Sequence, residues 1–349
     1  GFLPMYAPGD YRAVGTTIPD FTLHWVIAVD DYLRWSGDAA FAASLYPIVQ
    51  RSLRAFEPLR DGDGLLADIP FWNFVDWAAV ARAGAAGPVN GLYLLAQDAA
   101  ARIAAAAQDP RGAREHRAAA SRTRSAMRAR LRSRGGLFAD APGGPFSQHT
   151  NALAILGGAA TARSAPRIAA AIADPRRLRV TTMGRIVPPA DADPDYRADR
   201  HIVVAQPGFM GLVLRALGVA GRPGHALALI RRYWGPMAES GTCWETWSGR
   251  QSRCHPWATA PAAELPRLLL GTEPAAPGRD RVRIAPYTGE LAWARGRVPT
   301  PRGVIGVSWS RSGDGADLEV ELPDGITAEL PGGETVTAGR HQRRIAAAT

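Results

Sequence analysis

The chain has 349 residues, of which 46% are hydrophobic and 21% charged, enough to bury a large core in more than one domain. No stretch reaches the roughly 18 uninterrupted apolar residues of a membrane span, so we expect no membrane partner. The formal net charge is +9, but all 41 basic residues are arginines, scattered rather than gathered in a stripe with aromatics, which argues against a nucleic-acid partner.

Helical periodicity begins at residues 20–36, and Gly37 ends that helix. Residues 38–58 continue the pattern, with Pro47 expected to break or kink it. Further helical patterns lie at residues 89–107, 112–132, 147–160, 164–173, 200–218, 222–238 and 257–270. About nine helices, without a solenoid's repeat of roughly 33–47 residues, favour a ring of antiparallel hairpins. A ring of six hairpins needs twelve helices, so we expect it to be incomplete at the N-terminus.

From about residue 275 the pattern changes to short strands. Residues 281–284, 303–309 and 317–322 read as strands separated by Pro, Gly and Asp turns. The sequence therefore predicts a mainly α, (α/α)6 six-hairpin toroid over residues 1–273 and a small antiparallel β-sandwich over residues 274–349. The tail after about residue 340 is expected to be frayed.

The strongest cluster of candidate functional residues surrounds Glu245, which stands between Trp244 and Trp247 where a helix gives way to a loop. Aromatic neighbours remove a carboxylate from water, which favours it as a general base. Indole faces also pack on the apolar faces of sugar rings, and the nearby His255 could donate to a sugar hydroxyl. The alternative is that Glu245 pairs with an arginine or bonds a nearby helix end, and that the tryptophans belong to the core.

A second cluster, residues 70–77, again places a carboxylate beside indoles in a loop. Asp76 has an alternative role as the cap of a following helix, a role that Asp fills readily. Trp72 and its neighbour in the cluster, Trp77, need a surface to pack on, which is either core or ligand.

Two further loop-to-helix junctions carry polar and aromatic groups. Asp20 stands where a helix N-cap belongs, shortly before Trp25, and Ser147 is placed to cap the helix that contains His149. For His149, a buried ring and a pocket position are equally open. Four such junctions would meet at one mouth of a helical toroid, so together they predict a carbohydrate pocket.

The two cysteines, Cys243 and Cys254, form either a disulfide or a pair of free thiols. They leave the compartment open between cytoplasmic and secreted, and the sequence also leaves the oligomeric state open.

Two acidic stretches are candidate calcium sites. Asp61 and Asp63 begin like a calcium loop, but Leu65 stands where a third ligand belongs. The acidic run at residues 191–195 lacks the glycine and closing glutamate of such a loop. We therefore expect no metal and no cofactor.

Six segments, in this order, resemble the six-hairpin catalytic domain of glycoside hydrolase family 78, the α-L-rhamnosidases. They are IPDFTLHW at 18–25, WNFVDW at 72–77, NGLY at 90–93, SQHTNALA at 147–154, RRYWGPM at 231–237 and CWETW at 243–247. Residues 293–309 resemble the C-terminal β-domain of the same family.

The resemblance implies a hydrolase that releases terminal α-L-rhamnose from plant glycosides or polysaccharides with inversion. Inversion uses two carboxylates roughly 6.5–9.5 Å apart, one of which activates water. Glu245 matches the family's base and His255 a histidine that contacts the sugar. Further matches to pocket residues are weaker: Trp25, Trp72, Trp77 and Asp20. The family's acid lies in an Arg-x-Glu motif on an early hairpin that this sequence does not match, so we expect it upstream of the chain.

Two other classes of function stay open. One is a catalytically incomplete carbohydrate-binding or vestigial protein of the same fold. The other is a toroid enzyme such as a lyase or phosphorylase, although the Tyr-His pair that a lyase usually needs does not stand out.

Overall fold

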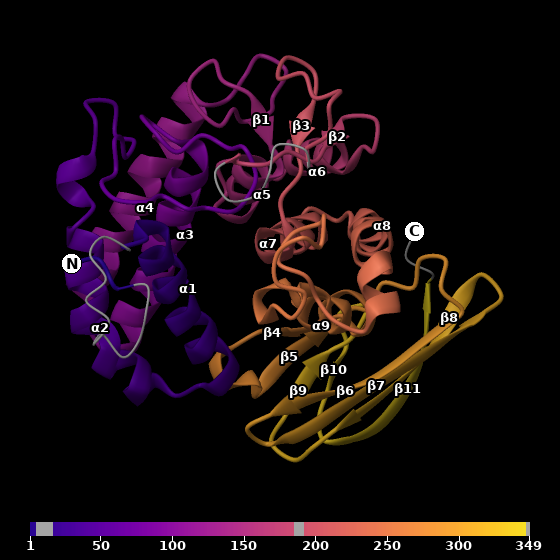
Figure 1. Ribbon diagram of the computed structural model, residues 1–349. Coiled ribbons are helices and arrows are strands. Elements are labelled where there is room, and N and C mark those ends of the chain that lie inside the picture. The colour runs from indigo at the N-terminus through magenta and orange to yellow at the C-terminus, as the bar shows by residue number, and fades with distance from the viewer. Residues whose placement is uncertain (5–16, 185–191, 347–349) are drawn as a thin grey trace. The chain divides into compact units, whose positions relative to one another are not determined.

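The structure is a computed structural model that describes residues 1–4, 17–184 and 192–346 (Figure 1). The chain divides into two compact units. The first consists of Gly1–Val29 and Ala43–Ala260, and the second of Asp30–Ala42 and Pro261–Thr349. Among the described residues, no helix is both long and apolar enough to cross a membrane.

Helices dominate the first part of the chain. They are α1 (Pro19–Ser36), α2 (Ala39–Arg54), α3 (Gly87–Ala106), α4 (Pro110–Arg130), α5 (Gln148–Leu156), α6 (Ala165–Ala173), α7 (Pro207–Val219) and α8 (Pro223–Ser240). The segment that joins α1 to α2 clusters with the second unit. A helix lies in each predicted range up to residue 238, and α2 continues through Pro47, so this proline does not break the helix.

The helices of the first unit form an inner and an outer set. α5 packs against α3 and α7, and most residues of these three helices are buried. α4 packs on α3 and has one buried face, whereas Arg114, Arg117 and Arg122 are exposed. An amphipathic helix outside an apolar one is the arrangement that buries both apolar surfaces.

A small parallel sheet leads into the inner helices. Its strands are β1 (Phe146–Ser147), β3 (Ile202–Val203) and β2 (Leu178–Arg179), in the order β1-β3-β2. The helix predicted from residue 200 therefore begins later, at Pro207, because the residues before it pair as a strand and proline suits a helix's first position. Ser147 caps α5 as predicted, accepting the Thr150 N–H at 3.3 Å.

The last predicted helix, residues 257–270, is divided into three short pieces in the structure. These are a 3-10 turn (Pro256–Ala258), α9 (Ala260–Leu265) and a π turn (Pro266–Leu270). The prolines that begin the two turns lack the N–H that a continuous helix would need there.

Two four-stranded sheets form the β-sandwich of the second unit. One has the order β10-β9-β5-β4 and contains β4 (Thr272–Pro274), β5 (Arg281–Ile284), β9 (Thr327–Glu329) and β10 (Thr335–Val336), with β5 and β9 parallel. The other has the order β11-β8-β7-β6 and contains β6 (Trp293–Thr300), β7 (Gly303–Ser312), β8 (Gly315–Leu322) and β11 (Gly339–Ala346). Alternate side chains of both sheets, such as Val282, Ile305 and Val320, form a common core.

The expectation of a frayed tail after residue 340 is wrong. β11 pairs antiparallel with β8 from Gly339 to Ala346. Ion pairs across the strands reinforce this pairing, including Arg340 to Glu319 at 2.7 Å, so the charges that looked like a solvated tail belong to a sheet face.

Candidate active site

Three of the four predicted junctions contribute to the lining of one cavity, of ≈ 240 Å³, within the first unit. The cavity lies where α1 and α7 begin and where the loops before α3 and after α8 pass. It is lined by Ile18, Phe21, Trp72, Phe74, Val75, Asp76, Trp77, Gln206, Gly208, Phe209, Glu245, His255 and Trp257. Aromatic side chains with a few polar groups are the usual walls of a small-molecule site.

Glu245 brings a partly exposed carboxylate to this cavity. Gly241 ends α8 in the left-handed conformation, and the following loop is closed by the Glu245 N–H bonding the Ser252 carbonyl at 2.8 Å. The Trp77 indole N–H donates to Oε1 at 3.0 Å, and the Ser252 N–H donates to Oε2 at 3.3 Å. His255 Nδ1 lies 3.9 Å from Oε2. Within the described residues no arginine is paired with Glu245, so the alternative of a carboxylate locked in an arginine pair does not apply.

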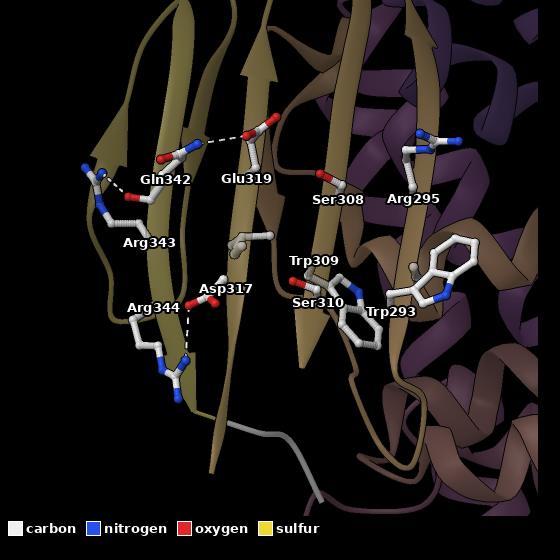
Figure 2. A pocket seen from close by; sticks show the side chains of 12 residues that line it. Trp293, Arg295, Ser308, Trp309, Ser310, Asp317, Glu319, Gln342, Arg343 and Arg344 are labelled. Atoms are coloured by element: carbon white, nitrogen blue, oxygen red, sulfur yellow. Dashed lines mark hydrogen bonds and ion pairs between the residues drawn. The ribbon is translucent and has the colours of Figure 1, made fainter. Parts of the chain in front are cut away.

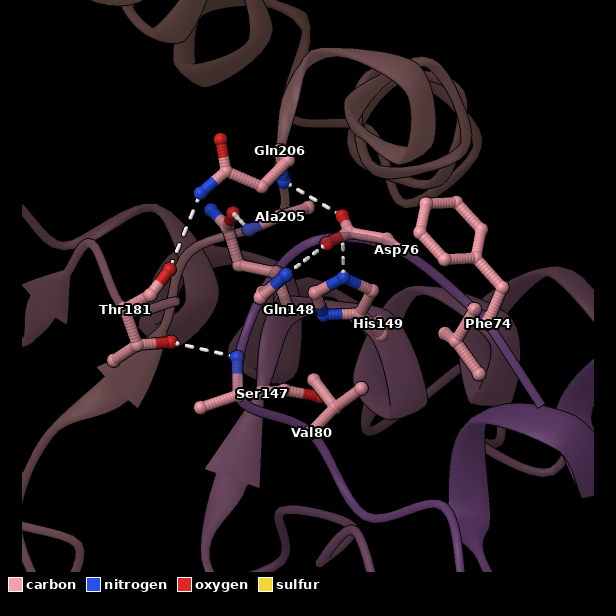
Figure 3. A network of polar contacts seen from close by, with 12 residues as sticks. Phe74, Asp76, Val80, Ser147, Gln148, His149, Thr181, Ala205 and Gln206 are labelled. Atoms are coloured by element: carbon pink, nitrogen blue, oxygen red, sulfur yellow. Dashed lines mark hydrogen bonds and ion pairs between the residues drawn. The ribbon is translucent and has the colours of Figure 1, made fainter. Parts of the chain in front are cut away.

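Asp76 has a different environment, because its carboxylate is saturated by neighbours (Figure 3). Oδ2 accepts the Gln206 N–H at 2.7 Å and faces His149 Nε2 at 2.9 Å, while Oδ1 accepts the Ala78 N–H. The predicted role as a helix cap is wrong, since the next helix begins only at Gly87. Asp76 instead ties the loop before α3 to the start of α7.

His149 lies behind the cavity wall rather than on it. Its ring is fully buried, faces the Asp76 carboxylate and packs against Phe209 with ring centroids 4.5 Å apart. His149 supports two lining residues, Asp76 and Phe209, but is not itself a lining residue, although a contact with substrate was predicted for it.

Two buried charges, one of which sequence reasoning missed, shape the loop before α3. The guanidinium of Arg82 donates to the carbonyls of Phe74 at 3.1 Å and Ala78 at 2.8 Å, and burial lowers its pKa. From the other side Asp20 accepts the N–H groups of Phe74 at 3.0 Å and Val75 at 2.9 Å. These contacts hold Val75 at φ 56°, a conformation rare for a β-branched residue.

Asp20 is therefore a structural neighbour of the pocket and not part of its lining. Its side chain is fully buried, and burial raises the pKa of its carboxyl group to about 6, against the opposing effect of the two backbone N–H groups. It lies in the first turn of α1 but bonds the distant loop instead of capping its own helix.

The predicted tryptophans divide between the lining and its support. Trp72 and Trp77 line the cavity, and the Trp72 indole N–H is buried without a partner among the described residues. Trp247 fixes the Glu245 loop by donating to the Ala205 carbonyl at 2.8 Å. Trp244 donates to Ser240 Oγ at 3.0 Å, and neither it nor Trp25 is among the lining residues.

Sequence reasoning missed several lining residues. Gln206 and Phe209 fell inside a predicted helix, although the proline between them marks a helix start that could have placed them at the mouth. Phe21 and Phe74 had no signal beyond their positions in the recognised segments. Trp257 closes the wall next to His255 and packs edge-on against Phe21, with centroids 5.2 Å apart.

Neither the acidic stretches nor the cysteines contribute a residue to the lining. Arg130 Nη1 stands 2.8 Å from both the Asp61 and Asp63 carboxylates, so a guanidinium occupies the space between them. Asp191 lies outside the described residues. In the part of the chain that the structure describes, no group of three or more His, Cys, Asp or Glu could hold a metal. Cys243 and Cys254 are free thiols.

Comparison with known families identifies two matches that together cover most of the chain. Residues 1–182 match the bacterial α-L-rhamnosidase six-hairpin glycosidase domain, and residues 271–344 match the bacterial α-L-rhamnosidase C-terminal domain. An α-L-rhamnosidase of Alteromonas sp. strain LOR is 32% identical in an alignment that covers 38% of this chain and 16% of that protein.

Solved structures share the fold over most of the chain. The family 78 rhamnosidase of Bacillus sp. GL1 superposes with a TM-score of 0.75 at 29% identity, over 91% of this chain and 34% of its own. An α-L-rhamnosidase of Streptomyces avermitilis, solved with L-rhamnose, gives 0.68 at 18% identity, over 90% of this chain and 31% of its own. The chain thus spans about a third of these proteins. The predicted fold class, a mainly α six-hairpin toroid followed by a β-domain, is confirmed.

Proposed function

The chain belongs to the bacterial α-L-rhamnosidase six-hairpin glycosidase family, and we propose that it takes part in hydrolysing terminal α-L-rhamnosides with inversion, with Glu245 as the general base. The observation that carries this proposal is the placement of Glu245: a carboxylate free of arginine, held by two N–H donors, on the wall of an aromatic cavity.

The geometry around Glu245 suits a base that takes a proton from water. The Trp77 and Ser252 N–H groups fix the orientation of the carboxylate and leave lone pairs for a water molecule. Water activated in this way attacks the anomeric carbon from the face opposite the leaving oxygen, so the product has the inverted configuration. His255, 3.9 Å from the same carboxylate, is placed to contact a sugar hydroxyl.

The leaving oxygen needs a proton from a second carboxyl group. Asp76 does not fit this role, because both its oxygens already accept hydrogen bonds. Asp20 does not fit either, since it is turned to the backbone of the loop behind the wall. We therefore propose that neither Asp76 nor Asp20 is the general acid.

The walls of the cavity favour a sugar with an apolar edge. Trp72, Phe74 and Trp77 form an aromatic group, with Phe74 and Trp77 centroids 4.7 Å apart. Rhamnose is a 6-deoxy sugar, and its methyl group gains from contact with such a surface. The unpartnered indole N–H of Trp72 is available to a hydroxyl of the same ring. The Streptomyces relative solved with L-rhamnose supports this choice of substrate.

The test uses an aryl α-L-rhamnoside with an activated leaving group, whose departure needs little help from an acid. Glu245→Gln keeps the size of the side chain and removes the base, so we expect kcat to fall by about 10²–10⁴-fold. Turnover unchanged by Glu245→Gln would contradict the proposal. Binding of rhamnose without turnover by the parent chain would instead favour a carbohydrate-binding protein that lacks a complete catalytic pair.

A further inference from the structure

The outward face of the sheet β11-β8-β7-β6 carries polar side chains in ordered rows (Figure 2). The strand registers place Trp293, Ser310, Asp317 and Arg344 in one row and Arg295, Ser308, Glu319 and Gln342 in the next. A third row contains Arg297, Gly306, Glu321 and Arg340. The side chains of the alternate positions, such as Trp309, point into the core.

The rows form a groove because the strand β7 presents only small groups. Gly306, Ser308 and Ser310 make its floor, with the longer side chains of β6 on one side and of β8 on the other. Two hollows of ≈ 740 Å³ and ≈ 290 Å³ lie on this face and share Arg295, Ser308 and Glu319. From Gly306 to Ser310 the groove runs for roughly 13 Å at the usual rise of a strand.

Packing does not require a glycine at position 306. A Cβ built there would come no closer than 3.4 Å to Glu321, which is an ordinary contact, and its φ is not in the left-handed region. Glycine weakens a strand interior, and it often marks a place where a ligand approaches the backbone closely. Gly306 thus leaves the floor of the groove open at a position where a larger side chain would fit.

The two walls differ in their charge. On the β8 side, Asp317 and Glu319 are already paired with Arg344 at 3.1 Å and Arg340 at 2.7 Å. On the β6 side, the exposed Arg295 has no hydrogen-bond or ion-pair partner among the described residues. Arg297 and, across the groove, Glu321 also have no such partner among the described residues. Their opposite charges lie in the same row, so the net positive charge is at the end of the groove where Arg295 adjoins Trp293.

Trp293 is the most exposed of the large apolar residues at this groove, with 65% of its surface accessible. It stands two positions before Arg295 on the same face of β6, an edge strand, at a spacing of roughly 6.8 Å. An indole face stacks on the apolar face of a pyranose ring, and a guanidinium binds a carboxylate through two parallel hydrogen bonds.

We propose that this groove binds an acidic oligosaccharide, with a sugar ring stacked on Trp293 and the carboxylate of a uronic acid unit bound by Arg295. Serine hydroxyls on the floor then donate hydrogen bonds to sugar hydroxyls and accept them, and the carboxylate of Glu321 accepts them. An acidic protein segment fits less well, because a protein interface needs a desolvated apolar centre, whereas this face is polar around one indole. The proposal goes beyond the catalytic assignment and does not depend on it.

Titration calorimetry of the full chain with tri-galacturonic acid tests the proposal. We expect saturable binding that weakens at least tenfold in Trp293→Ala and at least fivefold in Arg295→Gln. Ser308→Phe keeps both side chains but fills the floor, so it should abolish the binding. The matched control is Arg283→Gln, which removes an exposed arginine from the other sheet and should leave the dissociation constant unchanged. A neutral galactose trisaccharide should bind at least tenfold more weakly than the acid.

Several results would overturn this site. They are the absence of binding, equal affinity for the neutral trisaccharide, binding that survives Trp293→Ala, and tighter binding of polyglutamate or duplex DNA with the same dependence on Arg295. Hydrolysis of an aryl rhamnoside by the same variants should stay at the parent rate. A parent chain that hydrolyses the aryl rhamnoside but does not bind tri-galacturonate would reject the groove alone. A parent chain that binds tri-galacturonate but does not hydrolyse the rhamnoside would reject only the proposed function.

Discussion

The orientation of Glu245 depends on a residue that is 168 positions away in the sequence. The indole N–H of Trp77 holds one carboxylate oxygen, and the loop that carries Trp77 is in turn fixed by Asp20, Asp76 and Arg82. Each of these contacts is buried or part-buried and has its partner in place, which gives the site one defined geometry.

Trp77→Phe tests the role of this single hydrogen bond. It keeps an aromatic wall but removes the donor to Glu245 Oε1, and a hydrogen bond to a charged group contributes about 1.5–3 kcal/mol. We therefore expect kcat/KM on an aryl rhamnoside to fall by about 10- to 150-fold, since 1.36 kcal/mol corresponds to a factor of ten.

The control for this variant is Trp244→Phe, which removes an indole N–H next to Glu245 in the sequence but outside the lining. We expect it to change kcat/KM less than twofold. Equal losses in the two variants would mean that the Trp77 hydrogen bond has no special role.

Asp20 predicts a dependence of stability on pH. Its folded pKa, about 6, lies above the ordinary aspartate value of 3.8, so the folded state retains the proton that the unfolded state has lost between these values. Stability from Asp20 is thus greatest below about pH 4 and decreases as the pH rises to 6. We expect the difference in unfolding free energy between the parent and Asp20→Asn, from urea titrations, to shrink over this range. A difference that grows with pH would contradict the burial argument.

Single residues of the site could be predicted only in part. Trp72, Asp76, Trp77, Glu245 and His255 do lie on the cavity lining, and their contact with substrate stays a prediction. The other five predicted site residues lie outside the cavity lining, namely Asp20, Trp25, His149, Trp244 and Trp247. A motif shows that a segment belongs to the site, but which of its side chains faces the cavity depends on contacts such as Asp76 with Gln206 that join distant segments.

At the level of elements, the inner helices α3 and α5 approach each other closely because a glycine of one faces a leucine of the other. A Cβ built on Gly91 of α3 would lie 2.5 Å from the Leu153 Cβ of α5, closer than two carbons can come. The preceding residue, Asn90, accepts the Leu66 N–H at 2.8 Å and donates to the Leu66 carbonyl at 2.9 Å. Gly91 thus allows the close contact with α5, and Asn90 fixes the backbone of Leu66 to α3.

Gly91→Ala tests the close approach of α3 and α5. In a free helix this change stabilises by about 1 kcal/mol. Here the added methyl group forces the helices apart, so we expect a net loss of about 1–3 kcal/mol in the free energy of unfolding, measured by urea denaturation. An unchanged or increased stability would show that the inner helices are not in contact at this point.

Helices were the most predictable elements, because a long apolar periodicity leaves few alternatives. The main errors arose where pairing partners are distant. β11 carries the charges of a solvated tail, yet it completes a sheet through β8, and residues 202–203 continue a helical pattern but pair with β1 and β2. The long loop before α3 has no periodicity and depends on Arg82 and Asp20 for its shape.

At the scale of the whole molecule, the site and the further groove lie in different units. The cavity with Glu245 belongs to the first unit, and the groove on β7 to the sandwich of the second. Their ligand chemistries differ accordingly: an aromatic cavity that suits a deoxy sugar, and a polar face that suits an acidic chain. The composition and charge of the sequence did not predict this difference, because only the strand register shows which arginines of the sandwich lie on the same face.

The central claim is that water activated by Glu245 attacks the anomeric carbon with inversion. Proton NMR during hydrolysis of an activated aryl α-L-rhamnoside tests it most directly, because the first-formed anomer can be recorded before mutarotation. The account predicts that β-L-rhamnose appears first with the parent chain and that Glu245→Gln forms neither anomer at a comparable rate. Initial formation of α-L-rhamnose, or of β-L-rhamnose at an undiminished rate by Glu245→Gln, would contradict it.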